Sequence, residues 1–298
     1  APAVEGLSPV LTPVADFYRI DTALTVPQVD VASWRLRITG RVDREVTLDL
    51  DRLLGLGLIE VDATIACVSN EVGGGLIGTA RWTGVPLTRV LELAGPRPDA
   101  EQLVGRSVDG WTAGFPLAVL DDGREALVAV GMQGEPLSPR HGAPARLVVP
   151  GLYGYVSATK WLTELELTGW ESFDAYWVPR GWAKEAPIKP SSRIDVPRDG
   201  ASVPAGEVEV AGVAWAPTGG VHAVEVRIDD GPWRGATLAS PLSAATWVQW
   251  RLRVPLAVGT RVLTVRVIDA AGRPQPAGPV PVLPDGAEGN HQRRLLVV

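Results

Sequence analysis

Cys67 is the single cysteine of the 298-residue chain, and it ends a short apolar segment, VDATIAC. Ser69, Asn70 and a run of three glycines follow it. A thiol at the end of a strand, beside backbone that can approach a ligand closely, could act as a nucleophile or bind a metal. A lone cysteine in an apolar strand is also often an inert small hydrophobic residue. The segment alone leaves both interpretations open, although one cysteine excludes an intrachain disulfide and any multi-thiolate zinc or iron–sulfur site.

A second group of reactive residues lies between positions 141 and 160. His141 is the one candidate general base, and Arg146 follows it in the segment HGAPAR. Lys160 comes after a Gly-rich turn, GLYGY, in the company of hydroxyl side chains. Basic groups and hydroxyls beside glycines can form an anion-binding hollow. Turns of this composition are also common on protein surfaces, so this segment too leaves a structural role open.

Composition excludes several classes of protein. The chain is 46% hydrophobic with 33 Gly and 26 Pro, which favours strands and turns over helices and provides enough apolar residues for real cores. The formal charge of −6, with basic and acidic residues interspersed, offers no basic stripe for nucleic acid. No apolar run reaches the roughly 20 residues that a membrane-spanning helix needs.

Residue patterns predict an α+β domain at residues 1–190 that begins with an extended, proline-rich arm over residues 1–30. Alternating apolar and polar residues predict a strand at 34–42, and an apolar run predicts a second at 61–67. Short helices are expected at 48–56 and 86–95, the latter opening on a proline. Beyond residue 108, strands and turns become dense, which predicts a mixed sheet with few helices. Residues 172–190, rich in Trp and Pro, predict a long loop between domains.

Residues 191–298 predict a second, all-β domain. Four segments of period two, separated by turn-rich sequence, are VEVAGVAW, AVEVRIDD, WVQWRLRVPL and RVLTVRVID. This pattern is typical of an antiparallel β-sandwich.

Taken in order, the segments FYRID, TIACVSN, VDGWTAGFPL and GEPLSPRHGAPARLVVPGLYGYVSATKWL resemble the molybdopterin domain of the sulfite oxidase family. The most specific part is the run 134–164, which follows the family's G-x-P-L turn, H-G-x-P-x-R unit, V-V-P-G and closing K-W-L. The segment that begins GVAWAPTGG is similar to the immunoglobulin-like, dimerisation-type domain that follows in this family. The resemblance therefore covers nearly the whole chain.

The resemblance implies a molybdenum cofactor with Cys67 as the only protein ligand of the metal, because a soft thiolate suits such a centre. Arg19 matches an arginine that faces the substrate, and Trp182 falls on the family's active-site tyrosine, so both are expected to be catalytic. His141, Arg146 and Lys160 are expected to hold the pterin and its phosphate. Further cofactor contacts that the matching implies are Tyr18, Arg19, Ser69, Asn70, Asp109, Ser157 and Thr159.

Two features refine the expected cofactor and substrate. The basic residues suffice for one phosphate and no G-x-G-x-x-G segment is present, which favours a mononucleotide-free pterin; the absence of C-x-x-C-H argues against haem. Glu71 and Val72 stand where sulfite oxidases have two arginines, so the pocket is expected to bind a dianion poorly. Arg180 or Lys184 could restore the lost charge if the interdomain loop folds over the metal.

The leading hypothesis is an oxidoreductase that transfers an oxygen atom between water and a small substrate at molybdenum. An alternative is a reductase of S-oxides or N-oxides that resembles the methionine-sulfoxide reductase subunit. An alternative of another class is a binding module that has lost its cofactor.

Partners and location follow indirectly. Without haem, electrons are expected to pass to or from an external cytochrome or membrane redox protein. The start at Ala1 and the likeness to bacterial, haem-free relatives predict an extracytoplasmic protein of the periplasm or cell envelope, whose signal or membrane anchor is missing from this sequence. A monomer or a homodimer is expected.

Overall fold

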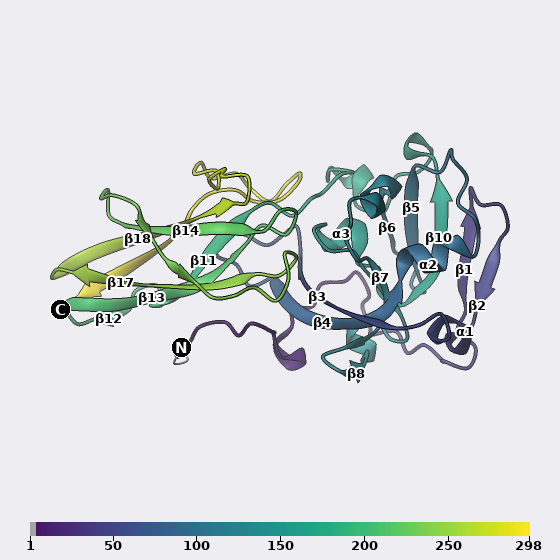
Figure 1. The fold of residues 1–298 in the computed structure, drawn as a ribbon, viewed down its shortest axis with the longest axis horizontal. Helices are drawn as coiled ribbons and strands as arrows, with labels where there is room; N and C mark the ends of the chain where they lie inside the picture. Colours follow the sequence, from purple (N-terminus) through teal and green to yellow (C-terminus); the bar gives the residue numbers. More distant parts are fainter. Residues whose placement is uncertain (1–3) are drawn as a thin grey trace.

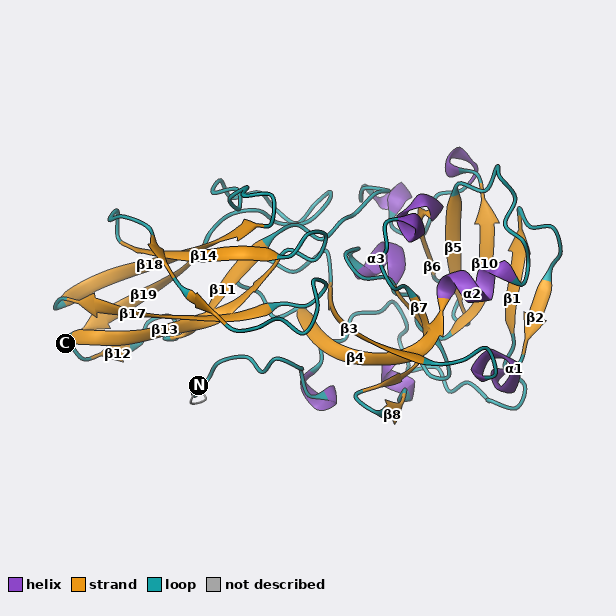
Figure 2. Ribbon diagram, in the orientation of Figure 1, coloured by secondary structure: helices purple, strands orange, loops and turns teal. Residues whose placement is uncertain are grey.

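A computed structural model describes residues 4–298 of the chain. Strands dominate, and they form four sheets along an elongated molecule (Figures 1 and 2). Two sheets built from residues between 36 and 168 lie at one end of the long axis. Two more, built from residues between 191 and 297, lie at the other end.

The first sheet is mixed and has the strand order β2-β1-β10-β5-β6. Strands β1 and β10 run parallel, and the other pairs run antiparallel. Along β1, Leu36 and Ile38 are fully buried and face the main core, while Arg37 between them is exposed, as the predicted alternation requires. The strand bounds are β1 Leu36–Gly40, β2 Val46–Leu48, β5 Gln102–Ser107, β6 Thr112–Pro116 and β10 Leu162–Thr168.

The second sheet has the order β3-β4-β7-β8, with β9 paired to β7. Its strands are β3 Ile59–Ala66, β4 Ile77–Pro86, β7 Leu127–Met132, β8 Glu135–Pro136 and β9 Arg146–Val148. The antiparallel β3–β4 pair is continuous from Ile59 to Ala66, and the buried end of β3 leads directly into Cys67. The strand predicted at 61–67 is confirmed, because it overlaps β3.

Helices are short, as the composition predicts. The α-helices are α1 Leu50–Leu54, α2 Leu87–Glu92 and α3 Gly154–Ser157. Asp49 accepts a hydrogen bond from the Arg52 backbone N–H at 2.9 Å and so caps α1. Short 3₁₀ turns are η1 Val14–Asp16, η2 Leu117–Asp121, η3 Pro139–His141, η4 Trp170–Ser172 and η5 Val178–Arg180.

Two sheets from the last third of the chain enclose a separate apolar core. One has the order β11-β13-β17-β16, and the other β12-β19-β18-β14-β15. Buried side chains of both sheets share this core, among them Val210, Trp250 and Val265. The strands are β11 Ser191–Val196, β12 Ser202–Val203, β13 Gly206–Trp215, β14 Val221–Ile228, β15 Arg234–Gly235, β16 Thr237–Leu238, β17 Val248–Leu256, β18 Gly259–Asp269 and β19 His291–Val297.

This two-sheet sandwich includes the four predicted strands as β13, β14, β17 and β18. Strand β19, which pairs with β18 along its whole length, was not predicted from the sequence. Neither was β11, the first strand after residue 190. Neither β11 nor β19 shows strict alternation, because each carries arginines, such as Arg193 and Arg293, that are partly covered by neighbouring elements.

Residues 4–30 of the predicted arm are mostly irregular but firmly packed, and residues 1–3 of that arm lie outside the described residues. The indole N–H of Trp247 donates to the Val10 carbonyl at 2.8 Å, and the Thr12 N–H donates to the Thr79 carbonyl at 2.8 Å. The Phe17 ring then packs edge-on against Trp82, with centroids 5.8 Å apart. These contacts fix the arm on β4 and on Trp247, which precedes β17, before the arm crosses the cavity described below.

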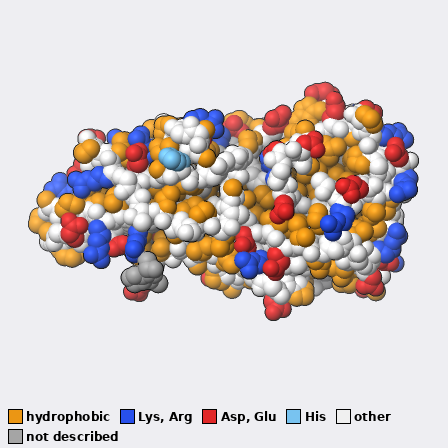
Figure 3. Space-filling model, viewed as in Figure 1, with side chains coloured by type: hydrophobic (Ala, Val, Ile, Leu, Met, Phe, Trp, Pro, Cys, Tyr) orange, Lys and Arg blue, Asp and Glu red, His pale blue; other side chains and the backbone are white. Residues whose placement is uncertain are grey.

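The surface carries both signs of charge. On the face shown in Figure 3, Lys and Arg side chains are interspersed with Asp and Glu over both ends of the molecule. Within residues 4–298, no helix is long and apolar enough to cross a membrane.

Candidate active site

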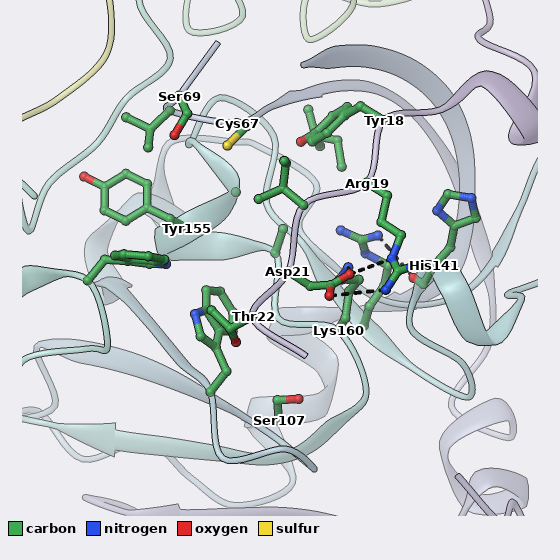
Figure 4. Close-up of a pocket in the computed structure, with 18 of the residues that line it drawn as sticks. Tyr18, Arg19, Asp21, Thr22, Cys67, Ser69, Ser107, His141, Tyr155 and Lys160 are labelled. Carbon is green, nitrogen blue, oxygen red and sulfur yellow. Dashed lines mark hydrogen bonds and ion pairs between the residues drawn. The ribbon is translucent and has the colours of Figure 1, made fainter. Parts of the chain in front are cut away.

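A cavity opens beside the end of β3. Its walls come from five separate parts of the chain: residues 17–22 of the arm, residues 65–69, the β5–β6 turn, residues 141–161 and the loop that carries Trp177 and Trp182. Figure 4 shows the arm, with Tyr18, Arg19, Asp21 and Thr22, running across this space. The tertiary fold thus gathers one site from segments far apart in the sequence.

The cysteine thiol faces this cavity, and hydrogen bonds hold the loop that follows it. The Cys67 N–H donates to the Leu76 carbonyl at 2.9 Å, and the Asn70 side-chain oxygen accepts from the Leu76 N–H at 2.7 Å. Burial raises the pKa of the Cys67 thiol, while hydrogen bonds from Ser69 partly oppose the rise. An uncoordinated Cys67 is therefore protonated at neutral pH, whereas a bound metal ion would favour the thiolate.

Arg146 is a buried cation in the cavity wall. Its guanidinium donates to the His141 carbonyl at 3.1 Å and lies over the Trp82 ring at 5.0 Å. Burial lowers its pKa to about 10, so it stays charged at neutral pH. Within residues 4–298 no carboxylate forms an ion pair with it. An unneutralised buried guanidinium is costly in isolation, and an anionic ligand would relieve that cost.

Lys160 and Arg19 share one carboxylate. The Asp21 Oδ2 atom lies 2.7 Å from Lys160 Nζ and 2.7 Å from Arg19 Nε. Burial lowers the pKa of Lys160 to about 8 even though Asp21 acts in the opposite direction. Burial would raise the pKa of Asp21, but the hydrogen bonds from Arg19 and Lys160 lower it overall. The three side chains form a charged group on one side of the cavity (Figure 4).

His141 completes this side of the cavity. Its Nε2 atom lies 3.3 Å from the Val14 carbonyl, and its ring meets Phe17 edge-on at 6.0 Å. Burial, followed by the charge of Arg146, lowers the pKa of His141. The ring is therefore neutral at pH 7, and a neutral imidazole can donate Nε2–H to the carbonyl of the arm.

The two ends of the segment from His141 to Lys160 lie side by side, joined by hydrogen bonds from Trp161. Trp161 has a left-handed backbone with φ of 49°, an uncommon conformation for a bulky residue. Its N–H donates to the Gly142 carbonyl at 3.2 Å and its indole N–H to the Pro139 carbonyl at 2.8 Å. Gly142 itself has φ of 103°, and a Cβ there would lie 2.9 Å from the Lys160 side chain. Close packing of these two turns places the imidazole and the ammonium group in one wall.

Aromatic side chains line another part of the cavity. The rings of Tyr155 and Trp182 lie 5.8 Å apart, and those of Trp177 and Trp182 lie 6.4 Å apart. The Tyr155 hydroxyl donates to the Ala183 carbonyl at 2.6 Å, so its proton is already used in holding the loop. Figure 4 shows Tyr155 near Cys67 and Ser69, on the side away from His141. This wall is apolar and is suited to an uncharged or polarisable ligand.

The structure brings most of the predicted site residues to this cavity. Those that line it are Tyr18, Arg19, Cys67, Ser69, Asp109, His141, Arg146, Lys160 and Trp182. Asn70, Ser157 and Thr159 do not line it. Asn70 holds the Cys67 loop, while the Ser157 and Thr159 hydroxyls donate to backbone carbonyls at 2.9 and 3.4 Å.

Some residues that line the cavity were not predicted from the sequence. Ser107, at the end of β5, has a buried hydroxyl without a hydrogen-bond partner, and it faces the cavity. Asp21, Tyr155 and Trp177 were also overlooked. For Asp21 a signal existed, because it stands two residues after Arg19 in the charged segment FYRID.

The structure corrects the expectation that Glu71 and Val72 lie in the pocket beside Cys67. Glu71 and Val72 line a smaller, separate hollow beside Tyr153 and Trp215, because the loop turns away from the cavity after Ser69. Their side chains therefore do not line the main cavity.

The two basic residues of the interdomain loop do not restore charge in the cavity either. Lys184 pairs with Asp174 at 2.7 Å, and the Arg180 guanidinium stacks on the Tyr176 ring at 3.8 Å. Neither side chain lines the cavity.

Comparison with known proteins supports the resemblance. Residues 23–177 match the family described as "Oxidoreductase molybdopterin binding domain". Human mitochondrial sulfite oxidase is 32% identical over 310 residues, which cover 87% of this chain and 56% of that protein. Chicken sulfite oxidase is 30% identical, with 87% of this chain and 67% of that protein covered. This chain thus spans about half the length of the human relative.

A solved structure has the same fold. The sulfane dehydrogenase SoxCD from Paracoccus pantotrophus superposes with a TM-score of 0.77 over 91% of this chain and 76% of that chain, at 24% sequence identity. The sequence match and the fold extend over both groups of sheets. The chain therefore belongs to the family of molybdopterin-binding oxidoreductases that includes the sulfite oxidases.

Proposed function

We propose that the protein is a molybdenum-cofactor oxidoreductase that transfers an oxygen atom to or from a small substrate, with the Cys67 thiolate as its protein ligand to molybdenum. The observation that carries this proposal is the placement of the single thiol in the same cavity as Arg146, His141 and Lys160. A soft ligand and a group of basic side chains are what a metal dithiolene with a phosphate tail requires.

The side chains of the cavity fit such a cofactor. The Ser107 hydroxyl is buried without a partner, and the Arg146 guanidinium is buried without a paired carboxylate within the described residues. Both would gain hydrogen bonds from a polar, anionic ligand. Arg146, His141 and Lys160 would hold the phosphate, and Tyr18, Ser69 and Asp109 lie where they could contact the pterin.

The chain's own residues would prepare and enclose the reaction. When bound, the cofactor supplies a metal that cycles between two oxidation states while oxygen is exchanged with water. Cys67 gives up its proton to become a ligand, and Ser69 donates hydrogen bonds that favour the thiolate. Tyr155 and Trp182 exclude water from one side of the site and position an apolar substrate. Arg19 lies at the cavity and would orient a substrate oxygen.

The cofactor is proposed to be the mononucleotide-free form. Arg146 and Lys160, with His141, provide donors for one phosphate, and no glycine fingerprint for a dinucleotide occurs in the sequence. Acid release of the cofactor followed by mass measurement tests this; a guanine dinucleotide form would contradict it. The chain is also proposed to bind no haem.

Relatives and site chemistry favour a sulfur-containing substrate. The human relative, at 32% identity, is named for sulfite oxidation. Oxidation of such a substrate, with water as the source of the oxygen atom, would release two electrons and two protons, and the oxidant would be an external cytochrome or membrane redox protein that accepts the electrons. The aromatic wall of Tyr155, Trp177 and Trp182 supports a second candidate, reduction of an S-oxide or N-oxide, which takes up two protons and two electrons from the external redox partner and releases water.

The remaining assignments are also proposals. Residues 1–190 are proposed to form the catalytic domain, and residues 191–298 an immunoglobulin-like, dimerisation-type domain, supported by the two-sheet sandwich. We also propose an extracytoplasmic location, in the periplasm or cell envelope.

Metal analysis tests the central proposal. After expression in a host that makes the cofactor, we expect one molybdenum per chain in the unmodified protein. The Cys67→Ser variant should fold, because the change is nearly isosteric, but should lose turnover and the thiolate contribution to the metal's absorption spectrum. Full activity of this variant would refute the ligand assignment, and absence of molybdenum from the unmodified protein would favour a cofactor-free binding module.

A further inference from the structure

Asp21 occupies the position of an anion between two cations of the cavity. One of its oxygens, Oδ2, lies 2.7 Å from both Lys160 Nζ and Arg19 Nε, and the other accepts from an Arg19 terminal nitrogen at 3.3 Å. The Asp21 side chain is 8% exposed and the Lys160 side chain 11%. The Asp21 carboxylate is buried and pairs with two cations, so its position is far more restricted than that of a carboxylate in a surface ion pair.

The arm holds Asp21 in this place. Four residues before it, Phe17 packs against Trp82 and against Gly78, where an added Cβ would lie 2.8 Å from the Phe17 ring. Further back, the Gln133 side chain donates to the Thr12 carbonyl at 2.9 Å. With the preceding residues fixed on β4, the carboxylate can leave its partners only if the short segment 18–22 moves.

Asp21 therefore alters the charge that a ligand meets. Arg19, Arg146 and Lys160 are the cations lining the cavity, and His141 is neutral there. Asp21 uses hydrogen bonds of both Arg19 and Lys160, whereas Arg146 has no carboxylate partner in the part of the chain that the structure describes. A free oxyanion that needs Arg19 or Lys160 must displace Asp21 or lie beside its negative charge.

We infer that Asp21 is a specificity-determining residue: it competes with oxyanions for Arg19 and Lys160, and so selects neutral or singly charged substrates over dianions. The inference rests on the proposed function only for the identity of the substrate. The sequence suggested that Glu71 and Val72 weaken the binding of dianions, but their side chains lie in another hollow. The inference assigns this discrimination against dianions to Asp21. The aromatic wall beside Cys67 suits the same uncharged substrates.

Anion binding to the cofactor-free protein tests the inference directly. Inorganic sulfate and inorganic phosphate are titrated by calorimetry into the unmodified protein, Asp21→Asn and Asp21→Ala. We expect both variants to bind these anions at least about tenfold more tightly, a change of about 1.4 kcal/mol. The double variant Arg19→Met with Asp21→Asn should lose part of this gain, and Glu71→Gln, an acidic residue outside the cavity, should bind like the unmodified protein.

The cofactor-loaded enzyme separates the two sources of oxyanion. If the gained affinity belongs to the cofactor's phosphate site, loading the cofactor abolishes phosphate and sulfate binding in the Asp21 variants, and this result would overturn the assignment of Asp21 to substrate selection. If it belongs to the substrate site, the loaded Asp21→Asn variant is inhibited by sulfate and has a KM for sulfite at least about tenfold lower, with a smaller change in kcat.

Equal anion affinities in the unmodified protein and both folded Asp21 variants would overturn the inference. Thermal unfolding curves show whether each variant is folded; Asp21→Asn keeps the shape of the side chain, and Asp21→Ala removes any residual competition. Because these titrations need no molybdenum, their failure is distinct from failure of the proposed function, which the molybdenum content and the Cys67→Ser variant report.

Discussion

Arg193 donates a hydrogen bond of 2.7 Å from its guanidinium to the carbonyl oxygen of Gly74. Arg193 belongs to β11 of the sandwich, and Gly74 to the loop that begins at Cys67. The same guanidinium pairs with Asp195 at 2.7 Å and donates to the Ser8 hydroxyl of the arm at 2.8 Å. One side chain of the sandwich thereby holds both the thiol-bearing loop and the arm that crosses the cavity.

Loss of this link should expose the thiol. A hydrogen bond from a charged donor contributes about 1.5–3 kcal/mol, so in Arg193→Met local opening of the loop should increase by about tenfold or more. The measurement is the rate of Cys67 alkylation by iodoacetamide in the cofactor-free protein, followed by mass. The single cysteine makes the adduct unambiguous.

The matched control is Arg253→Met. Arg253 pairs with Glu209 on the exposed face of the sandwich at 2.9 Å, and its loss should leave the alkylation rate unchanged. Arg193→Lys, which keeps the charge but not the fork of donors, should give an intermediate rate. An unaltered rate of Cys67 alkylation in Arg193→Met would show that the loop keeps its conformation without this hydrogen bond.

His291 should make stability depend on pH. Its Nδ1 atom accepts from the Ile194 N–H at 2.9 Å, and burial, then Arg293 and Arg193, lower its pKa from 6.5 to about 4. As pH falls below about 6.5, His291 becomes protonated in the unfolded chain. In the folded chain it becomes protonated only near pH 4. The contribution of neutral His291 to the free energy of unfolding is fully present above pH 6.5. It decreases by about 3 kcal/mol in total between pH 6.5 and pH 4.

Chemical unfolding at several pH values checks this expectation. His291→Gln should flatten the dependence of the free energy of unfolding between pH 6.5 and 4. His222→Gln, which changes an exposed histidine, should not. Parallel curves for the unmodified protein and His291→Gln would contradict the assigned pKa.

Arg146 should act on stability and on cofactor retention in opposite directions. It is 5% exposed, and burial lowers its pKa to about 10, which shows that the fold disfavours its charge. Arg146→Met should leave the cofactor-free protein at least as stable as before, because a methionine packs against Trp82 without that cost. The same variant should retain at least about tenfold less molybdenum, because an anionic contact is missing.

Thermal unfolding and metal analysis of the same preparations separate these effects. Arg140→Met provides the control, since Arg140 is an exposed neighbour that does not line the cavity. Full molybdenum retention in Arg146→Met would rule out this residue as a phosphate ligand.

Trp182 should contribute to substrate binding through its ring. Replacement of Trp182 by Ala removes aromatic contacts worth about 0.5–1.5 kcal/mol, so kcat/KM for a neutral sulfoxide should fall by about two- to tenfold. Trp233→Ala removes an indole of the sandwich that stacks on Arg266 at 4.2 Å, and it should leave kcat/KM unchanged. Equal losses in both variants would indicate a general effect on folding.

The local sequence determined much of the protein by itself. Alternation predicts β1, β13, β14, β17 and β18, because a half-buried strand must place apolar residues on one face. The segments that carry Cys67, His141, Arg146 and Lys160 resemble those of the sulfite oxidase family, and this resemblance is what points to the family and to most of the cavity wall.

Only the tertiary structure decided how charge is distributed in the site. Asp21 and Lys160 lie 139 residues apart in the chain, and nothing local indicates that they meet. The same holds for Glu71, which lies close to Cys67 in sequence but faces another hollow because the loop turns after Ser69. Local patterns fix which residues are present near a strand end, whereas the packing of the arm and the sandwich against that end fixes which of them share one cavity.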